Sequence, residues 1–316
     1  MAEPSWQPPG IVSRRLFLTD EGLRETAALL TARAVCSSQT VGKCAGDWVP
    51  FGRGRDQARD QQEDDIRSLV FETTPLDASI EILGAPVVTL DIASDRRIAN
   101  LVVRLCDVHP SGESLRVSYG VLNLTHREGH EQPVPLVVAE RYRVRIRLND
   151  AGSVFPSGHK VRLAISTTYW PMIWPSPETA IVQIFAGTLD LPQRSPNVAD
   201  ARLSPFPEPE TASPEKPTIF YRDGVRVERI DRIGLELGTQ YKSDYHIEEN
   251  DPLSAVAELQ NTRTMSRTGW QIRVETQMRL ISTGNAFLLK ASVHAWEGAN
   301  ELYRRDWDRS IPRDFI

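Results

Sequence analysis

The sequence has no apolar run approaching the roughly 18 residues that a membrane-spanning helix needs. Its first residues, Met1 to Trp6, show neither the basic start nor the apolar core of a signal peptide, which favours a cytoplasmic location. The three cysteines, Cys36, Cys44 and Cys106, are too few and too scattered for a disulfide framework. A Cys36–Cys44 bridge is conceivable, but free thiols are the favoured expectation in that compartment.

The chain also lacks the features of a nucleic-acid-binding protein. Its 37 Lys and Arg residues are outweighed by 42 Asp and Glu residues, and no basic stripe is interleaved with aromatic residues. The glycines around Arg53 lack the strand–loop–helix context of a phosphate-binding loop. With 316 residues, 40% of them hydrophobic and 25% charged, the composition predicts one large or two ordinary globular domains. We expect no cofactor, no nucleic-acid partner and no membrane partner.

The motif that carries the nucleophile of an α/β-hydrolase, Gly-x-Ser-x-Gly, is absent. Ser111 and Ser157 each stand between a proline and a glycine, in turns that connect expected strands. The alternation of strands and helices that would hold such a nucleophile is also absent from the pattern. We therefore interpret both serines as turn residues, predict no catalytic residue in this chain, and expect the chain alone to be inactive.

The histidines offer little for metal binding or catalysis. His126 and His130 have the spacing of zinc ligands on a helix, but the glycine between them favours a solvated loop. Asp107 and His109 fall on the same side of a strand end, where a carboxylate orients an imidazole in a catalytic relay. Without a nucleophile, a structural pair is favoured. His159 opens a strand and is interpreted as a capping or interface group, so we predict no metal site.

Short runs rich in β-branched residues, separated by turn signals, predict an all-β fold. Before residue 69 the pattern is irregular, with one short strand expected at 13–18. The remaining expected strands are 80–83, 87–93, 100–108, 115–124, 141–148, 160–168, 180–185, 224–230, 233–241, 255–262, 270–282 and 287–297.

Two of these segments alternate strictly between apolar and polar residues. Segment 141–148 places arginines on one side of the strand, and segment 161–166 alternates in the same way. The apolar positions are Tyr142, Val144, Ile146 and Leu148 in the first, and Val161, Leu163 and Ile165 in the second. A period of two with one wet face indicates antiparallel strands, whose apolar face needs a second sheet. This predicts a two-layer sandwich.

The domain layout is predicted from a change in composition. Residues 192–217 contain seven prolines with acidic residues between them, which indicates a linker or surface strap. We expect an irregular N-terminal segment at 1–68 that packs on a sandwich at 69–191. After the linker, an antiparallel β extension at 218–316 is expected, with a hairpin turn at 283–285 that leads into its last long strand.

The most unusual stretch is 169–177, which we call the aromatic–proline loop. It combines Tyr169, Trp170 and Trp174 with Pro171, Pro175 and Pro177. Exposed large rings are unfavourable, so they must cover something. Two interpretations stay open: the loop plugs the end of the sandwich, or its three rings line a cleft or interface shared with another domain.

Several segments, in this order, resemble the C-terminal non-catalytic domain of the X-prolyl dipeptidyl aminopeptidase and cocaine esterase hydrolases, the CocE/NonD family of α/β-hydrolases. The segments are 56–57, 64–71, 74–76, 82–88, 105–114, 155–166 and 169–177. Each is weak alone, and their order and spacing carry the resemblance over roughly residues 1–190. The tail beyond 217, ending in Ile311-Pro312-Arg313-Asp314, resembles an extension found in a subset of the family.

The resemblance implies a jelly-roll, galactose-binding-like β-sandwich that packs against an α/β-hydrolase catalytic domain supplying Ser, Asp and His. That domain is expected upstream or on a separate chain, and no family catalytic residue transfers to this sequence. The implied function is that of an accessory domain of a dipeptidyl-peptidase or esterase, supporting the substrate cleft and oligomer formation, with a homo-oligomer as a further expectation. The alternative is a stand-alone carbohydrate- or protein-binding jelly-roll module.

Overall fold

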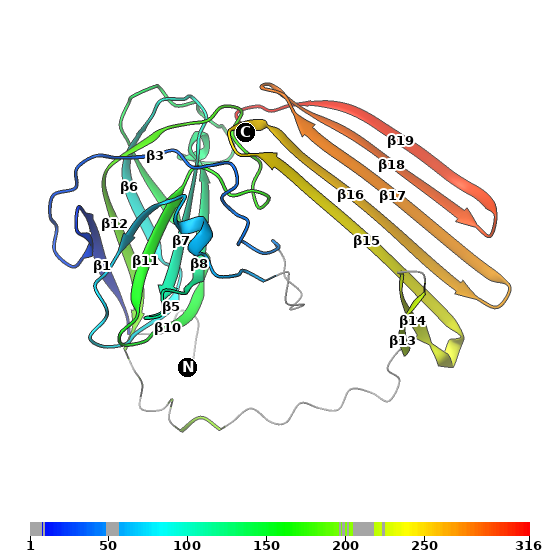
Figure 1. Ribbon diagram of the computed structural model, residues 1–316, viewed down its shortest axis with the longest axis horizontal. Helices are drawn as coiled ribbons and strands as arrows, with labels where there is room; N and C mark the ends of the chain where they lie inside the picture. The colour runs from blue at the N-terminus through cyan, green and yellow to red at the C-terminus, as the bar shows by residue number, and fades with distance from the viewer. Residues whose placement is uncertain are drawn as a thin grey trace. The chain divides into compact units, whose positions relative to one another are not determined.

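A computed structural model describes residues 8, 10–48, 57–195, 197, 200, 202–204, 218–222 and 225–316 (Figure 1). The chain divides into two compact units. The first comprises Met1–Leu203, Glu248–Pro252 and Phe315–Ile316, and the second comprises Ser204–Ile247 and Leu253–Asp314. Much of the proposed linker at 192–217, and Asp56 of the family resemblance, lie outside the described residues. The predicted layout therefore stays a prediction.

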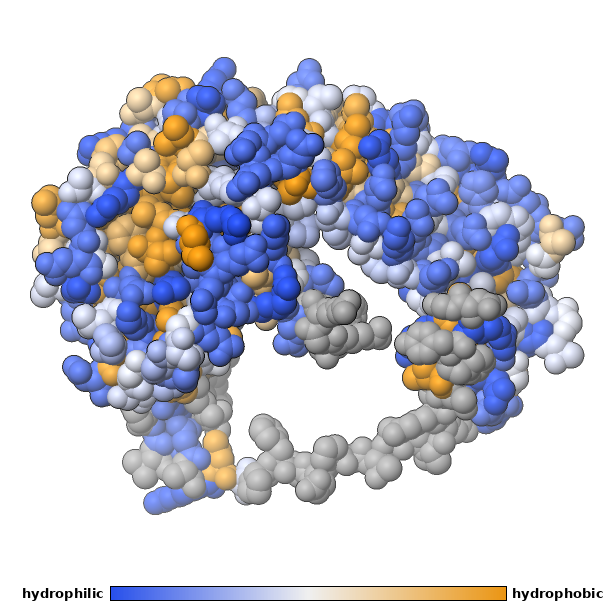
Figure 2. All heavy atoms as spheres, in the orientation of Figure 1, coloured by the Kyte–Doolittle hydropathy of each residue, from blue (hydrophilic) through white to orange (hydrophobic). Residues whose placement is uncertain are grey.

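The first unit consists of two antiparallel sheets. The larger, eight-stranded sheet contains β1 (Ile11–Thr19), β2 (Gly22–Arg24), β3 (Arg33–Val35), β5 (Ile80–Gly84), β6 (Val87–Ser94), β9 (Tyr142–Arg147), β10 (Ala151–Phe155) and β12 (Val182–Arg194). The four-stranded sheet has the order β4 (Leu69–Glu72), β11 (Lys160–Ser166), β7 (Asn100–Val108), β8 (Ser114–Asn123). The first unit also contains the short helical turns α1 (Gln62–Asp65) and η1 (Leu124–His126). Hydrophilic side chains make up most of the visible surface in Figure 2, and hydrophobic ones reach it in smaller patches.

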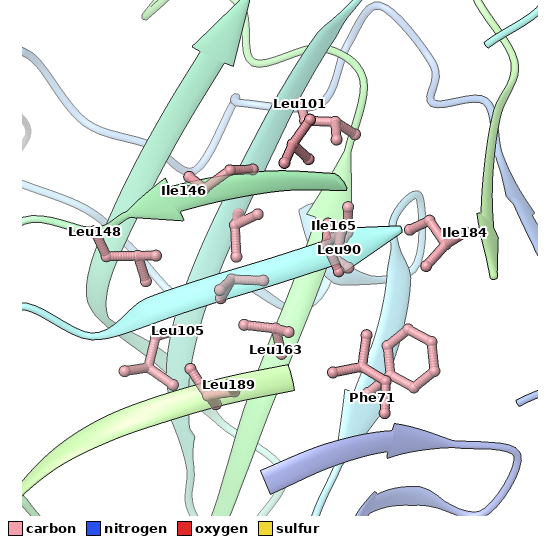
Figure 3. Packing of buried hydrophobic residues seen from close by; sticks show 14 of the residues in the cluster. Phe71, Leu90, Leu101, Leu105, Ile146, Leu148, Leu163, Ile165, Ile184 and Leu189 are labelled. Atoms are coloured by element: carbon pink, nitrogen blue, oxygen red, sulfur yellow. The ribbon is translucent and has the colours of Figure 1, made fainter. Parts of the chain in front are cut away.

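The core of the first unit lies between these two sheets. Leu90 on β6 and Ile146 on β9 belong to the same buried cluster as Leu105 on β7 and Leu163 on β11 (Figure 3). Two antiparallel sheets that bury one common core form a β-sandwich. The predicted all-β class is thus confirmed, while the jelly-roll strand order stays a prediction.

In the first unit most expected strands are present, and β2, β3, β4 and β10 were not among the expected ones. The strand expected at 100–108 is β7 with the same bounds, and β9 buries Val144 and Ile146 while its arginines face solvent. Residues 1–68, predicted to be irregular, contribute β1, β2 and β3 to the large sheet. β1 was expected only at 13–18, and it pairs with β12 from Ile11 to Phe17. β1 and β3 pair with β12, a strand far along the chain, and β2 pairs with β1, so local patterns alone do not create these elements.

The second unit is one seven-stranded antiparallel sheet in which sequential strands are neighbours. Its strands are β13 (Thr218–Arg222), β14 (Val225–Ile230), β15 (Leu235–Glu248), β16 (Asp251–Arg267), β17 (Trp270–Ser282), β18 (Ala286–Glu297) and β19 (Asn300–Pro312). A single turn, η3 (Asp231–Ile233), separates β14 from β15.

The predicted turn at 283–285 is present, because the amide of Thr283 donates to the carbonyl of Ala286 across 2.8 Å. The strand that follows this turn, β18, is not the last, however, since β19 pairs with it along its length. β19 was not predicted, because it contains many charged residues. One of them, Arg305, lies between Tyr303 and Trp307 on the same side of the strand and interrupts the alternation of apolar and polar residues.

Candidate functional site

A buried ion network lies on the side of the four-stranded sheet that faces away from the core. Arg104 on β7 and Arg162 on β11 point to this side, because their neighbours Leu105 and Leu163 fill the core. Asp65 of α1 lies between the two guanidiniums, with its Oδ1 3.1 Å from Nη2 of Arg104 and its Oδ2 2.9 Å from Nη1 of Arg162. The side chain of Arg104 is 0% exposed and that of Asp65 is 4% exposed. A full charge at such a depth requires a partner of opposite charge.

Neutral groups also form hydrogen bonds with the charged groups of this network. Arg104 donates through Nη1 to Gln61 Oε1 at 3.1 Å and through Nη2 to Ser68 Oγ at 2.8 Å. Ser114 Oγ donates to Asp65 Oδ2 at 2.7 Å. These bonds fasten the chain around α1 onto strands β7, β8 and β11. The network is therefore a structural clamp, with its charged groups engaged by one another.

The neighbouring carboxylate, Asp64, organises the loop at 41–45. Its Oδ1 accepts from the amide of Gly42 at 3.0 Å and its Oδ2 from the amide of Cys44 at 3.2 Å. Gly42 has φ +116°, and a Cβ there would meet the carbonyl oxygen of Trp170 at 2.3 Å. The amide of Trp170 in turn donates to the carbonyl of Val41 at 2.9 Å. The clamp thus reaches the aromatic–proline loop through direct backbone packing.

The three rings of the aromatic–proline loop differ in burial. Tyr169 is fully buried, its Oη accepts from Nη1 of Arg116 at 2.5 Å, and burial raises the pKa of its phenol to about 12. Trp170 is 6% exposed and its peptide bond to Pro171 is cis. Trp174 is half-buried, with its ring edge-on to that of Trp170 at a centroid distance of 5.1 Å. Tyr169 and Trp170 therefore pack inside the first unit, as the plug interpretation expects, and Trp174 is the least buried of the three.

A depression of about 510 Å³ opens beside Pro171. Lys43, Arg59 and Asp47 supply its charged groups, and Gly42 and Gly46 also line it. Trp48, which follows Asp47, is 65% exposed. Charged groups beside exposed or half-buried rings suit contact with another surface. Among the described residues that line this depression there is no serine, threonine or cysteine.

The candidate serines are turn residues. Ser157 Oγ donates to the carbonyl oxygens of Leu76 and Asp77, at 3.3 and 3.0 Å. Ser111 Oγ lies 2.7 Å from Nδ1 of His109, which also accepts from the backbone amide of Ser111 at 3.1 Å. The two bonds close a local turn at the end of β7, so His109 serves the turn rather than a reacting group.

The histidines are paired differently from the sequence-based expectation. Asp107 contacts His159 on the neighbouring strand, with its Oδ1 2.9 Å from Nδ1 of that ring, rather than His109. The rings of His109 and His159 stand edge to face at 4.9 Å. A catalytic relay needs one imidazole between a carboxylate and a nucleophile. Here the carboxylate and the serine contact different rings, which does not make such a relay.

Nδ1 of His126 and Nδ1 of His130 lie 3.2 Å apart in an exposed loop. In the described part of the chain, no three His, Cys, Asp or Glu side chains gather as a metal site. The three cysteines are free, as expected, with Cys36 exposed and the other two buried. Burial raises the pKa of the Cys106 thiol to about 12. No helix within the described ranges is long and apolar enough to cross a membrane.

The sequence analysis missed the buried clamp. Its signal was present in Leu101-Val102-Val103-Arg104-Leu105-Cys106, where one arginine interrupts an otherwise apolar strand. The adjacent Asp64 and Asp65 supply carboxylates in a segment noted only for its family resemblance. A lone charge inside an apolar strand indicates a buried partner elsewhere in the chain.

The model of the family described as the X-Pro dipeptidyl-peptidase C-terminal non-catalytic domain matches residues 1–198. Cocaine esterase of Rhodococcus sp. is 26% identical over 130 residues, which cover 40% of this chain and 22% of that protein. The chain spans less than a third of the length of the curated relatives that it matches.

Two solved structures share the fold. An aminopeptidase from the marine sediment archaeon Thaumarchaeota archaeon aligns with a TM-score of 0.55 at 19% identity, covering 62% of this chain and 38% of that one. An alpha-amino acid ester hydrolase aligns with a TM-score of 0.51 at 23% identity, covering 58% and 36% respectively. At these identities the likeness concerns the fold.

Proposed function

The chain belongs to the family of X-Pro dipeptidyl-peptidase C-terminal non-catalytic domains, and on this premise we propose that it is the accessory β-domain of a serine hydrolase. The match over residues 1–198 carries the proposal, because it includes every strand of the sandwich. The turn geometry of Ser111 and Ser157 agrees with it. Catalysis then belongs to an α/β-hydrolase domain, upstream or on a separate chain, that acts on esters or X-Pro peptides.

The proposed contact with that domain is the surface formed by Pro171, Trp174, Lys43, Asp47 and Arg59. Prolines and half-buried rings offer apolar area that needs little ordering when a partner docks. Tyr169 and Trp170 hold this surface from below, so the hydrolase meets a preformed shape at the mouth of its substrate cleft. The proposal includes oligomer formation. It also includes a cytoplasmic location, which the three free thiols support.

A stand-alone binding module is the second candidate. A depression of about 480 Å³ on the outer side of the large sheet has Ser13, Thr89, Arg15, Arg145 and Asp190 among its lining residues. Hydroxyl and charged groups of this kind suit sugar hydroxyls, but none of the described residues that line it is aromatic. Because a stacking ring is the usual platform for a sugar, the accessory role is proposed first.

Co-expression with the α/β-hydrolase encoded upstream or next to this chain tests the accessory role. We expect the two to co-elute, and Trp174→Ala to weaken their association by roughly 1–3 kcal/mol, the range of a central aromatic anchor. The melting temperature of the Trp174→Ala chain should stay unchanged, while Trp170→Ala should lower it. Trp270→Ala, in the second unit, is the matched control for loss of an indole. Separate elution, or equal binding by the Trp174 and Trp270 variants, contradicts the proposal.

A further inference from the structure

The loop between η1 and β9 brings two histidines together without a helix. His126 ends η1, and its carbonyl oxygen accepts from the amide of Gly129 across 3.1 Å, which closes a turn. Gly129 has φ +143°, a conformation that residues with a Cβ rarely adopt. Beyond this turn, Nδ1 of His130 lies 3.2 Å from Nδ1 of His126. The glycine that argues against a helical zinc motif therefore belongs to the turn that pairs the two rings.

The distance between the two nitrogens suits bonds to one shared metal ion. Imidazole nitrogens bind Zn²⁺ at about 2.0–2.1 Å, so nitrogens 3.2 Å apart subtend an angle of roughly 100° at a common ion. This angle is close to that of a tetrahedral shell. The ring centroids lie farther apart, at 5.2 Å, so each ring turns its Nδ1 toward the other ring. Since His130 is exposed, a small rotation of its ring directs both nitrogens at one point.

Both rings are able to bind the ion as neutral imidazoles. In the pair without an ion, one Nδ1–H donates to the other Nδ1. When the donating ring carries its proton on Nε2 instead, the Nδ1 lone pairs of both rings are available. The ion thus replaces a proton that moves to the other nitrogen of the same ring, and no proton has to leave the protein.

The surrounding backbone holds the two histidines in place. Asn123 Oδ1 accepts from the amide of Thr125 at 3.0 Å, and the carbonyl of Thr125 accepts from the amide of Val134 at 2.8 Å. Nη1 of Arg127 donates to the carbonyl oxygens of Leu124 and Val134, at 3.2 and 2.6 Å. Ligands that are ordered before binding lose little entropy when the ion arrives.

The charges of this loop favour a cation. Glu128 and Glu131, next to the histidines in the chain, are both exposed carboxylates. The one cation among them, Arg127, is engaged by backbone carbonyls, and its guanidinium lies 4.4 Å from the centre of the Tyr142 ring. Two carboxylates against one guanidinium give the segment from His126 to Glu131 a net negative charge. A divalent cation therefore finds attraction rather than repulsion here.

The chemistry of the ligands selects the kind of ion. Imidazole nitrogen suits Zn²⁺, Ni²⁺ and Cu²⁺, whereas Mg²⁺ and Ca²⁺ prefer oxygen ligands. Within the described ranges no third His, Cys, Asp or Glu joins the pair, so water supplies the remaining ligands. A shell with two protein ligands differs from a structural zinc site, which four protein ligands close.

We infer that His126 and His130 form a site for one divalent transition-metal ion, bound through both Nδ1 atoms and completed by water. The sequence alone predicts no metal site, because Gly129 excludes the helix on which this histidine spacing is usually found. The inference goes beyond the accessory role and involves no hydrolase, so its failure leaves that role untouched.

Isothermal titration calorimetry of the full chain without a histidine tag tests this inference, with zinc chloride and nickel chloride as probes. We expect one ion of either kind to bind per chain, and magnesium chloride to give no binding. His130→Gln should weaken binding by roughly tenfold or more, because the second bond of a linked pair of ligands is lost. The matched control is His246→Gln, which removes an exposed histidine of β15 and should leave the dissociation constant unchanged.

Gly129→Ala provides a second test that keeps both histidines. No atom beyond the neighbouring residues lies within 4 Å of a Cβ at this position, so the substitution strains only the turn. It should weaken binding severalfold. Gly112→Ala is the matched control, since Gly112 also has a positive φ in open space and donates to the carbonyl of His109 in a similar turn.

Circular dichroism and thermal melting establish that each variant is folded. Absence of binding, or heats that do not saturate at one equivalent, overturns the inference. So does a dissociation constant that responds equally to His130→Gln and His246→Gln, or equally to Gly129→Ala and Gly112→Ala.

Discussion

Nη2 of Arg104 lies 3.1 Å from Oδ1 of Asp65, and the two side chains are 0% and 4% exposed. This pair joins a strand in the middle of the four-stranded sheet to the short helix α1. Asp64, which directly precedes Asp65, holds the loop at 41–45 by accepting hydrogen bonds from its backbone amides. Since this loop packs against Trp170, the ion pair also positions the backbone that supports Trp170. The surface proposed to meet a hydrolase thus depends on an ion pair that solvent does not reach.

Removing the charge of Asp65 should strongly destabilise the first unit. In Asp65→Asn the guanidiniums of Arg104 and Arg162 lose their shared carboxylate, and such a loss from a buried pair costs about 3–5 kcal/mol. Denaturant unfolding measures the change. Asp150→Asn, which removes the exposed partner of Arg147, should change the free energy of unfolding by less than about 1 kcal/mol. Similar losses in the two variants would show that the clamp does not carry the stability.

Glu72 should make stability depend on pH in acid. Burial alone would raise the pKa of Glu72, but hydrogen bonds from Lys160 and Arg162 outweigh it and hold that pKa below its ordinary value of 4.5. The carboxylate therefore contributes stability above pH 4.5, and this contribution is lost as the pH falls through the lowered pKa. We expect Glu72→Gln to lose less stability than the parent chain between neutral and acidic pH. Glu25→Gln, at an exposed carboxyl, should follow the parent, and a Glu72 variant that also follows it would refute the effect.

Thiol labelling should distinguish the three cysteines. Cys36 is exposed and should react rapidly with a disulfide reagent at neutral pH. Burial raises the pKa of both Cys44 and Cys106, so the reactive thiolate is scarce and inaccessible at these positions. One thiol should react in the native chain and all three in denaturant, and Cys36→Ser should abolish the rapid phase. A thiol that still reacts rapidly in that variant would mean that the packing around Cys44 or Cys106 opens readily.

The isolated chain should not hydrolyse p-nitrophenyl esters or X-Pro amides. The hydroxyl of Ser157 is engaged by backbone carbonyls, and the carboxylate of Asp107 contacts His159 rather than the ring beside Ser111. Rates should equal those of buffer, and Ser111→Ala or Ser157→Ala should change nothing. Turnover above buffer that either substitution removes would place a catalytic serine in this chain.

Strands β9 and β7 show how far the sequence alone predicts which side chains are buried. The alternation of arginines with Val144 and Ile146 predicts which side of β9 is buried, because side chains alternate along any extended strand. The same rule applied to β7 would place Arg104 in solvent. The structure buries it completely, since residues around α1 cover that side of the sheet. The pairing of Asp107 with His159 likewise required the register between β7 and β11.

The sequence by itself determined the all-β class, most of the strands, the family and the absence of a hydrolase nucleophile motif. These features depend on the periodicity of apolar residues and on motifs within a few residues of one another. Such patterns can be read without knowing which distant segments the chain contacts. Only the tertiary structure decided that Tyr169 and Trp170 are buried while Trp174 is less so, and that Arg104 finds Asp65. It also decided the register in which strands β16 to β19 pair. These features arise from contacts between residues distant along the chain, and their burial depends on which segments cover them rather than on the residues themselves.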